Sequence, residues 1–477
     1  MSPALRVALV HYHLRPGGVT SVLRHAAAGL TAHGAACVTL AGAPPPSAAW
    51  PGPVHVVPGL DYDGDLAPAA LAAALEQSAA AALGGPPDVW YVHNHSLGRN
   101  LPLLGAVRAL GERGAALLLH LHDFPEDGRP ALYQRLRDRA GAEPRALDRL
   151  VYPCGPRVHY AVLTTRDAEV LKRAGAPPER VHHLPNPVLL DGPVPGPPPA
   201  DGGRLYPTRA IRRKNLGEFL LWAATSPPGP RWATTLAPRS PADCAAYERW
   251  VDFAQARRLP VDFAVGARAP EQPLTHWLAG AAEVFTTSVG EGFGLAFLEP
   301  WLAGRPLRGR DLPAITADFR AAGVALPGLY ERLDVPLGWA GADDLRAAVT
   351  RGLQASREAY GRTLETDAVE QAWSAAVRGT EVDFGRLPEP LQQRVLEQVL
   401  RAGADWSPPA PAPVSAAVLA SNRRAVATSF SAPACAARLW TACQAVAAGG
   451  VGALDALDAG ALLDAFLAPA HFCLLRT

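Results

Sequence analysis

Several common features are scarce in this sequence, and each scarcity excludes a class of protein. The six cysteines are scattered, without the spacing of a metal site or a disulfide framework, as is typical of a reducing cytoplasm. Lys and Arg number 45 against 44 Asp and Glu, so a net charge of +1 argues against a nucleic-acid partner. No apolar run reaches the ~18 residues of a spanning helix. The start is too short and too polar for a signal peptide. We expect a cytoplasmic protein without a transmembrane segment, and contact with a membrane surface stays open.

What is present is the rhythm of alternating strands and helices. The length of 477 residues and the 49% hydrophobic content suffice for about two to four domains. Strand-like runs separated by helical or loop segments predict parallel sheets. In the first half they lie at 5–11, 36–41, 54–57, 88–93, 116–122, 158–164 and 180–184. In the second half they lie at 204–207, 233–237, 261–265 and 284–288.

A glycine pair follows the first predicted strand. Gly17 and Gly18 stand between that strand and an apolar-periodic helix expected from about Val19 to Leu30. No G-x-G-x-x-G follows the strand, which argues against an ordinary dinucleotide dehydrogenase. Two adjacent glycines alone are a weak signal, because loops contain many of them. Their position directly after the first strand is what makes them a candidate ligand contact.

Residues 284–304, VFTTSVGEGFGLAFLEPWLAG, are the most informative segment. A buried strand passes through a glycine-rich turn into a helical stretch, with Glu291 in the turn and Glu299 a little over two turns on. Gly292 and Gly294 let the backbone approach a ligand, with amide groups directed at it from a helix start. Amides suit phosphate oxygens and carboxylates accept hydrogen bonds from hydroxyls, so the segment suits a nucleotide sugar. A strand-to-helix junction with two incidental glutamates is the alternative.

This segment resembles the signature of the family-4 retaining glycosyltransferases, which is Glu, seven residues, Glu, with Gly-Phe-Gly after the first Glu. The resemblance implies an α/β fold of the GT-B type, with two Rossmann-like domains and a donor/acceptor cleft between them. It implies that Glu291 contacts the transferred sugar and Glu299 the ribose. It also implies donor contacts by the turn residues Phe293, Gly294 and Leu295. Pro300 departs from the small residue usual there, and it predicts a lost helix N–H and a kink near Glu299.

Other short motifs fit the same family. Arg209 and Lys214, in LYPTRAIRRKNL, have the Arg, four residues, Lys spacing of the family's second domain. Two fixed cations at the mouth of a parallel sheet can neutralise a diphosphate leaving group. A solvated basic turn that includes Arg212 and Arg213 is the alternative. In the family the pair Gly17-Gly18 lines the cleft near the diphosphate and the acceptor.

Histidines gather after two further strands. His93 and His95 end the strand of 88–93, and His120 and His122 end that of 116–122, where ligands of open α/β sheets bind. The family often has a His close to the donor sugar here, and His122 is the best match. The four histidines also raise the possibility of a metal site, which we do not expect because Arg and Lys can supply the charge. The adjoining charged run, Asp123, Glu126, Asp127 and Arg129, suits either an acceptor-binding loop or a solvated turn.

The motifs define an expected organisation. We expect an N-terminal Rossmann-like acceptor domain at 1–190, a linker at 191–203 and a nucleotide-sugar domain with a helical insertion at 204–406. The last part, 407–477, would hold a second linker, a closing helix within 421–447 and an unassigned tail at 450–477. Residues 387–400 are the clearest amphipathic helix of the insertion.

The predicted function is retaining transfer of a hexose from a nucleotide-diphosphate sugar to a hydroxyl acceptor, with no cofactor and no metal. Retaining members of the family lack an obvious enzymic nucleophile, so the departing phosphate would deprotonate the acceptor. The expected catalytic residues are His122, Arg209, Lys214 and Glu291, and the expected substrate-binding residues are Gly17, Gly18, Asp123, Phe293, Gly294, Leu295 and Glu299. The donor, the acceptor and the linkage are left open, with a soluble acceptor favoured. The alternatives are an inactive sugar-nucleotide-binding subunit and a GT-B epimerase or phosphorylase, although a phosphorylase needs a cofactor lysine and the chain has only Lys172 and Lys214.

Overall fold

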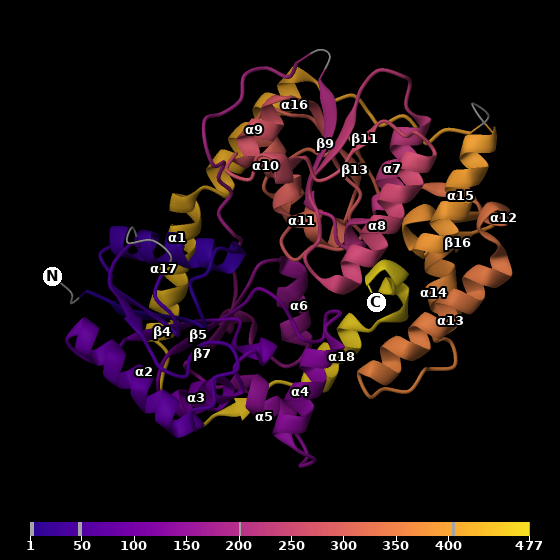
Figure 1. The fold of residues 1–477 in the computed structure, drawn as a ribbon. Coiled ribbons are helices and arrows are strands. Elements are labelled where there is room, and N and C mark those ends of the chain that lie inside the picture. Colours follow the sequence, from indigo (N-terminus) through magenta and orange to yellow (C-terminus); the bar gives the residue numbers. More distant parts are fainter. Residues whose placement is uncertain (1–3, 46–49, 200–201, 403–405, 477) are drawn as a thin grey trace. The chain divides into compact units, whose positions relative to one another are not determined.

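The chain forms two compact units in the computed structural model, which describes residues 4–45, 50–199, 202–402 and 406–476 (Figure 1). The first unit contains the chain up to Pro187 together with Phe430–Leu467. The second contains Val188–Ser429 and the chain from Ala468 onward. Parts of four expected segments lie outside the described residues: 1–3 and 46–49 of the first domain, 200–201 of the linker, 403–405 of the nucleotide-sugar domain and Thr477 of the tail.

A seven-stranded parallel sheet is the centre of the first unit. Its order is β3-β2-β1-β4-β5-β7-β8, and all seven strands match predicted runs. Their bounds are β1 (Arg6–His11), β2 (Ala36–Ala41), β3 (Val54–Val56), β4 (Val89–His93), β5 (Leu117–Leu121), β7 (Val158–Val162) and β8 (Val181–His183). A separate two-residue pair, β6 (Pro153–Cys154) and β18 (Asp455–Ala456), is antiparallel.

Helices cover both faces of this sheet because successive strand side chains point to opposite faces. In β1, Val7 and Leu9 pack with one apolar cluster and Ala8 and Val10 with another. The first cluster includes residues of α1 (Gly18–Ala32) and α17 (Ala432–Ala447). Helices on the second cluster are α2 (Pro68–Leu83), α3 (Leu101–Glu112), α4 (Pro130–Ala140), α5 (Ala146–Val151), α6 (Thr165–Arg173) and α18 (Ala459–Phe466). Strands buried on both faces explain the nearly continuous apolar runs in the sequence.

The second unit is built on a six-stranded sheet in the order β11-β10-β9-β12-β13-β14. Its strands are β9 (Gly203–Arg209), β10 (Trp232–Leu236), β11 (Val261–Asp262), β12 (Ala281–Thr286), β13 (Leu307–Arg310) and β14 (Leu329–Tyr330). Its helices up to Ala321 are α7 (Leu216–Thr225), α8 (Pro241–Ala256), α9 (Leu274–Ala279), α10 (Glu299–Leu302) and α11 (Pro313–Ala321). The predicted strand 261–265 ends early, because Val265 begins a short 3₁₀ helix.

The helical C-terminal region was expected, and its small sheet was not. Helices α12 (Leu337–Ala340), α13 (Ala342–Ala359), α14 (Ala368–Ala376) and α15 (Glu389–Ala402) surround an antiparallel sheet of β15 (Asp334–Pro336), β17 (Glu381–Asp383) and β16 (Val377–Arg378). The strands of this sheet have two or three residues, too few for an alternating pattern to be visible in the sequence.

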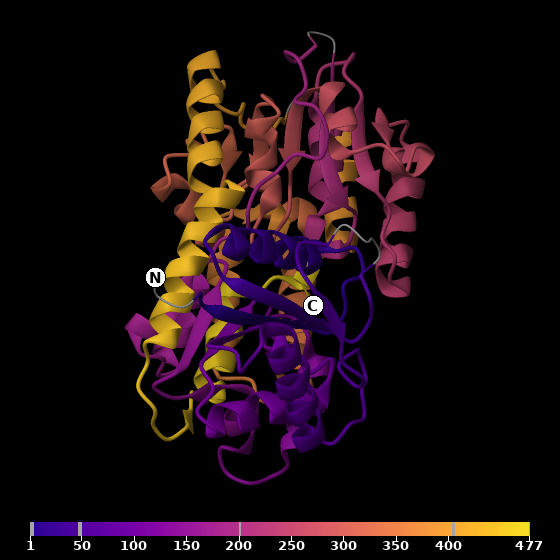
Figure 2. The same ribbon diagram turned by 90° about the vertical axis from the view of Figure 1, so that its left-hand side faces the viewer.

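The expected closing helix is two helices. α16 (Ala416–Ser429) belongs to the second unit, and α17 belongs to the first (Figure 2). Ser431 caps α17 through its side chain, and proline occupies its first turn, so a new helix starts there.

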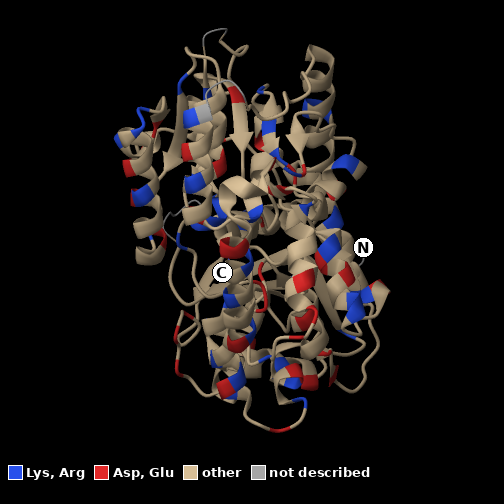
Figure 3. Ribbon diagram, turned by 90° about the vertical axis from the view of Figure 1, so that its right-hand side faces the viewer, with Lys and Arg blue, Asp and Glu red and all other residues tan. Residues whose placement is uncertain are grey.

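In the view of Figure 3, Lys and Arg positions are interspersed with Asp and Glu positions along the ribbon. None of the described helices combines the length and apolar character that crossing a lipid bilayer requires.

Candidate functional site

The two donor motifs of the second unit meet at the carboxyl ends of neighbouring strands. The 3₁₀ helix η3 (Arg212–Lys214) follows β9, and the loop with Glu291 follows β12, which is adjacent to β9 in the sheet. Lys214 Nζ donates a hydrogen bond to Glu291 Oε1, and the two side chains are only 14% and 9% exposed. Burial lowers the pKa of Lys214, and the charge of Glu291 opposes that shift. Two residues that the sequence motifs predict as donor contacts therefore lie next to each other in the structure.

Backbone hydrogen bonds hold the two motifs together. The amide of Val289 and the hydroxyl of Ser288 both donate to the carbonyl of Arg213, at 2.9 and 3.3 Å. Thr287 Oγ1 lies 3.0 Å from the carbonyl oxygens of Lys214 and Asn215. The relative position of Lys214 and Glu291 is therefore fixed by the backbone as well as by their ion pair.

The remaining cations of the motif have different surroundings. Arg209 donates to the carbonyl of Ala237 at 3.1 Å, and among the described residues no carboxylate pairs with it. Burial and the nearby Arg239 lower its pKa. Arg212 instead forms a bidentate pair with Glu389 at 2.7 and 2.9 Å, so the turn is not a solvated basic loop. Arg209 therefore carries no acidic partner among the described residues, and the buried Nε of Arg213 also lacks a hydrogen-bond partner there.

Glu299 lies in a different local structure from the one expected. The predicted continuous helix is a single 3₁₀ turn, Leu295–Phe297, followed by the four-residue α10, which Glu299 begins. Pro300 is in the first turn of α10, where a missing N–H costs nothing, so it does not kink a longer helix.

The Glu299 carboxylate has no hydrogen-bond partner among the described residues. Burial, and secondarily Asp191, raise its pKa to about 7. A half-buried acceptor without a protein donor is the arrangement expected at a place where ligand hydroxyls bind.

The turn residues divide between packing and exposure. Gly294 has φ 91°, and a Cβ there would come within 2.8 Å of Phe297, so the turn requires glycine. Phe293 is buried and makes an edge-to-face contact with Phe319, whereas Leu295 is 36% exposed. Any contact of Phe293 with a ligand therefore involves its backbone.

In the first unit, the glycine pair lies at the open start of a helix. Gly17 precedes α1 and has an extended φ of 173°, and the helix has no side-chain cap. A Cβ on Gly18 would meet nothing within 4 Å, and one on Gly17 only a carbonyl oxygen at 3.9 Å. Neither glycine is required by local packing, so both leave space over the amides of the α1 N-terminus.

Three of the four predicted histidines come together. His93 Nδ1 and His122 Nε2 are 2.9 Å apart, and the Tyr91 hydroxyl hydrogen-bonds to His120 Nδ1 at 2.6 Å. His95 is placed apart, with its Nε2 hydrogen-bonded to the carbonyl of Val151 at 3.0 Å. The Asn94 side chain accepts from the backbone amides of His122 and Asp123 and so orders the end of β5.

Burial keeps these imidazoles neutral. It lowers the pKa of His120 to about 3 and those of His93 and His122 well below the usual range. His93 Nε2 and His120 Nε2 have no partner among the described residues. Neutral imidazoles with unsatisfied nitrogens can bind hydroxyl groups.

The histidine geometry also bears on metal binding. Ligand nitrogens of His93, His120 and His122 lie within 4.8 Å of one another, close enough for a common ion. The rings of His120 and His122 are stacked, however, with centroids 4.1 Å apart and planes 29° apart. Because an imidazole lone pair lies in the ring plane, a shared ion would have to lie where the planes of these two rings meet.

The charged run after β5 is neither fully solvated nor free. Asp123 pairs with Arg129 at 2.5 Å. Glu126 is buried, accepts a hydrogen bond from the Tyr152 hydroxyl at 2.9 Å, and has its pKa raised by burial to about 7. The solvated-turn alternative therefore fails for Glu126.

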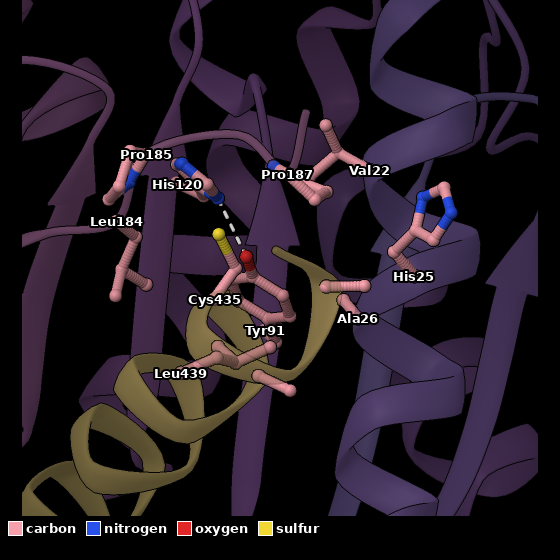
Figure 4. A pocket seen from close by; sticks show the side chains of 12 residues that line it. Val22, His25, Ala26, Tyr91, His120, Leu184, Pro185, Pro187, Cys435 and Leu439 are labelled. Atoms are coloured by element: carbon pink, nitrogen blue, oxygen red, sulfur yellow. Dashed lines mark hydrogen bonds between the residues drawn. The ribbon is translucent and has the colours of Figure 1, made fainter. Parts of the chain in front are cut away.

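Two cavities adjoin these groups. In the first unit, Tyr91, His120 and Cys435 line a mostly apolar pocket of about 30 Å³ (Figure 4). A pocket of this size has room for ordered water but is too small for a sugar. In the second unit, a polar pocket of about 310 Å³ lies beside Val289 of the donor loop and is also lined by His471 and Cys473. Those two residues come from the tail to which the sequence assigned no role, and no motif there could have revealed them.

Comparisons with known proteins agree with this fold. No family model matches the chain. The chain is 25% identical over 233 residues to the mannosylglucosyl-3-phosphoglycerate synthase of Petrotoga mobilis. The match covers 44% of this chain and 44% of the synthase, so it spans less than half of that relative. A Rickettsia africae glycosyltransferase superposes with TM-score 0.51 at 9% identity, covering 94% of this chain and all (100%) of the other.

Two further solved structures have comparable similarity. Sucrose-phosphate synthase from Thermosynechococcus elongatus gives TM-score 0.50 at 14% identity, over 92% of this chain and 98% of the other. HepE from Anabaena, in complex with UDP, gives TM-score 0.50 at 15% identity, over 91% and 98%. The chain therefore has the GT-B fold, and the fold implied by the sequence motifs is confirmed.

Proposed function

We propose that the chain is a retaining glycosyltransferase that moves a hexose from a nucleotide-diphosphate sugar to a hydroxyl acceptor without a metal ion. The observation that carries the proposal is the buried Lys214–Glu291 pair at the ends of β9 and β12, with Arg209 on the same motif. Similarity to named glycosyltransferases and to a structure containing UDP supports it.

The second unit supplies donor recognition in this proposal. A diphosphate competes with Glu291 for the ammonium of Lys214 and recruits Arg209, whose guanidinium has no acidic partner among the described residues. Glu291, released from Lys214, accepts hydrogen bonds from the transferred sugar. The unpartnered carboxylate of Glu299 accepts hydrogen bonds from the ribose hydroxyls.

The chemical step needs no enzymic nucleophile. The bond from the anomeric carbon to the phosphate oxygen breaks, and a bond to the acceptor oxygen forms on the same face. The acceptor proton moves to the departing phosphate. Lys214 and Arg209 stabilise the negative charge that develops on the leaving diphosphate, which is where electrostatic stabilisation lowers the barrier. His122, Gly17 and Gly18 of the first unit are proposed contacts of the sugar, the diphosphate and the acceptor.

The acceptor is proposed to be a small hydroxylated molecule. The Petrotoga relative carries a phosphoglycerate in its name, which supports including small phosphorylated acceptors among the candidates.

The test is a donor panel. Thermal shifts with UDP, GDP, ADP and their glucose and mannose conjugates identify the nucleotide, and NMR of the product with the selected donor gives the anomeric configuration. Stabilisation by one nucleotide, followed by transfer with retention, is expected. No stabilisation by any of these nucleotides would overturn the proposal, and inversion would overturn its mechanism.

A further inference from the structure

The tail beyond Ala468 lies against both donor motifs of the second unit. Its two short 3₁₀ helices are η8 (Pro469–His471), which packs on α14, and η9 (Leu474–Arg476), which packs on η3. Figure 1 marks the C-terminal end of this tail. The carbonyl of Leu474 accepts a hydrogen bond from Arg212 at 3.2 Å. The segment that contains Lys214 is therefore in direct contact with η9.

Anchors fix the path of this tail. Arg386 donates to the carbonyl oxygens of Phe472 and Ala470, at 2.5 and 3.3 Å. Cys473 Sγ lies 3.5 Å from the carbonyl of Gly385. A Cβ on Gly352 of α13 would come within 2.6 Å of the Leu474 side chain, so a glycine makes room for η9. The tail is thus a packed part of the second unit.

Arg476 rests on the donor loop. A Cβ on Gly290 would lie 2.8 Å from its Nε and 3.1 Å from its Cδ. Gly290 is not among the glycines with positive φ, so its backbone does not call for glycine, but a side chain there would displace Arg476. The next residue is Glu291, the partner of Lys214.

We infer that Arg476 is a further cation of the nucleotide-sugar site and binds the diphosphate of the donor. This inference rests on the proposed function. A guanidinium can form two parallel hydrogen bonds to a phosphate. Arg476 contacts the loop just before Glu291, the residue that would release Lys214 when a diphosphate binds. The donor site then includes a residue 185 positions from Glu291 in the sequence, which a motif search does not find.

The test uses matched nucleotides. Affinities of UDP and UMP, GDP and GMP, and ADP and AMP are measured by calorimetry for the full chain, and the pair that the wild type prefers is kept. We expect Arg476→Gln to weaken diphosphate binding by about 10- to 100-fold and monophosphate binding by less than about 3-fold, because the lost contacts are charge-assisted. Arg476→Lys should retain part of the affinity.

Controls separate a ligand contact from a packing role. Arg423→Gln makes the same charge change on the exposed surface of α16 and should leave both affinities unchanged. Gly290→Ala should weaken diphosphate binding by displacing Arg476, and this effect should disappear in the Arg476→Gln background.

Two outcomes overturn the inference. Equal loss of mono- and diphosphate affinity in Arg476→Gln would show that Arg476 only holds the tail in place. Unchanged diphosphate affinity in Arg476→Gln, with loss in Lys214→Ala, would reject Arg476 while leaving the proposed function intact. A wild-type protein that binds none of the nucleotides would reject both.

Discussion

Lys214 and Glu291 are 77 residues apart in the sequence and form a buried ion pair in the second unit. Both were expected to bind a donor, one through its phosphates and the other through its sugar. The pair means that each residue neutralises the other before a ligand binds, so an anionic ligand must replace Glu291 as the partner of Lys214. This exchange makes the two residues separable by experiment.

Glu291→Gln should uncouple binding from transfer. The amide keeps the shape of the side chain but no longer competes with the diphosphate for Lys214, so nucleoside diphosphate affinity should equal or exceed that of the wild type. Transfer should collapse, because the contact to the sugar is weakened. Calorimetry with the selected diphosphate and a turnover assay on the same preparation check this. A fall in affinity as large as the fall in turnover would contradict the role assigned to Glu291.

Glu299→Ala should act on the nucleotide itself. The unpartnered carboxylate would lose its bonds to ribose hydroxyls, and a hydrogen bond to a charged group contributes roughly 1.5–3 kcal/mol. The comparison is between the ribo- and 2′,3′-dideoxyribonucleotides, which differ only in these hydroxyls. The variant should bind both alike. If Glu299→Ala keeps the wild-type preference for the ribonucleotide, Glu299 does not contact the ribose.

Glu299 also predicts a pH dependence of stability. Its pKa is raised from 4.5 to about 7 by burial and Asp191, so between these values the folded protein holds a proton that the unfolded chain has released. The unfolded state then binds fewer protons, and the free energy of unfolding falls as the pH rises through this window.

Thermal unfolding from pH 4.5 to 8 tests this dependence against a matched variant. Glu126 and Asp167, with pKa values raised to about 7 and about 6, contribute slopes of the same sign. The difference between the wild type and Glu299→Gln therefore isolates Glu299, and Glu299→Gln should have the shallower slope. Identical slopes would show that folding does not raise the pKa of Glu299.

The sequence predicts most of the framework because its signals are local. All strands of the first sheet are apolar runs bounded by turn residues, and Arg209, Lys214 and Glu291 belong to short motifs at the ends of such strands. Parallel strands bring their carboxyl ends to one edge, so the meeting of η3 with the Glu291 loop follows from the order of the strands.

What the sequence did not predict depends on contacts distant in the chain. Arg310 is buried between Glu218 and Asp383, which lie 92 and 73 residues away in the sequence. Arg476 reaches Gly290 only because Phe472 and Leu474 are packed elsewhere in the unit. The break between α16 and α17 depends on Ser431, whose side chain caps α17. The apolar pattern of a helix continues through this position, so the break is not visible in the sequence.

Arg310 should therefore be a stability residue. It hydrogen-bonds to Glu218 at 2.6 Å and to Asp383 at 2.7 Å, and all three side chains are at most 5% exposed. Arg310→Ala leaves two buried carboxylates without their counter-charge, and breaking a buried pair in this way costs about 3–5 kcal/mol. Calorimetric unfolding should show a large drop in Tm, whereas Arg378→Ala, at an exposed position, should not. A drop equal in both variants would contradict the network's role.

The last prediction concerns charge on the leaving group. If Arg209 and Lys214 neutralise the diphosphate, transfer should persist in excess EDTA, because no metal is needed to supply that charge. Arg209→Ala and Lys214→Ala should each lower kcat by about 10²–10³-fold, the usual loss when one contact to developing charge is removed. Arg239→Ala, which removes a neighbouring arginine that lowers the pKa of Arg209, is the matched control and should have a much smaller effect.

The histidine cluster provides the opposite outcome. Stoichiometric metal in the purified protein, lost on His93→Ala or His120→Ala, with activity abolished by chelation and restored by the ion, would transfer the neutralising role from the two cations to a metal. We expect the first result because Arg209 and Lys214 already supply positive charge beside the donor loop.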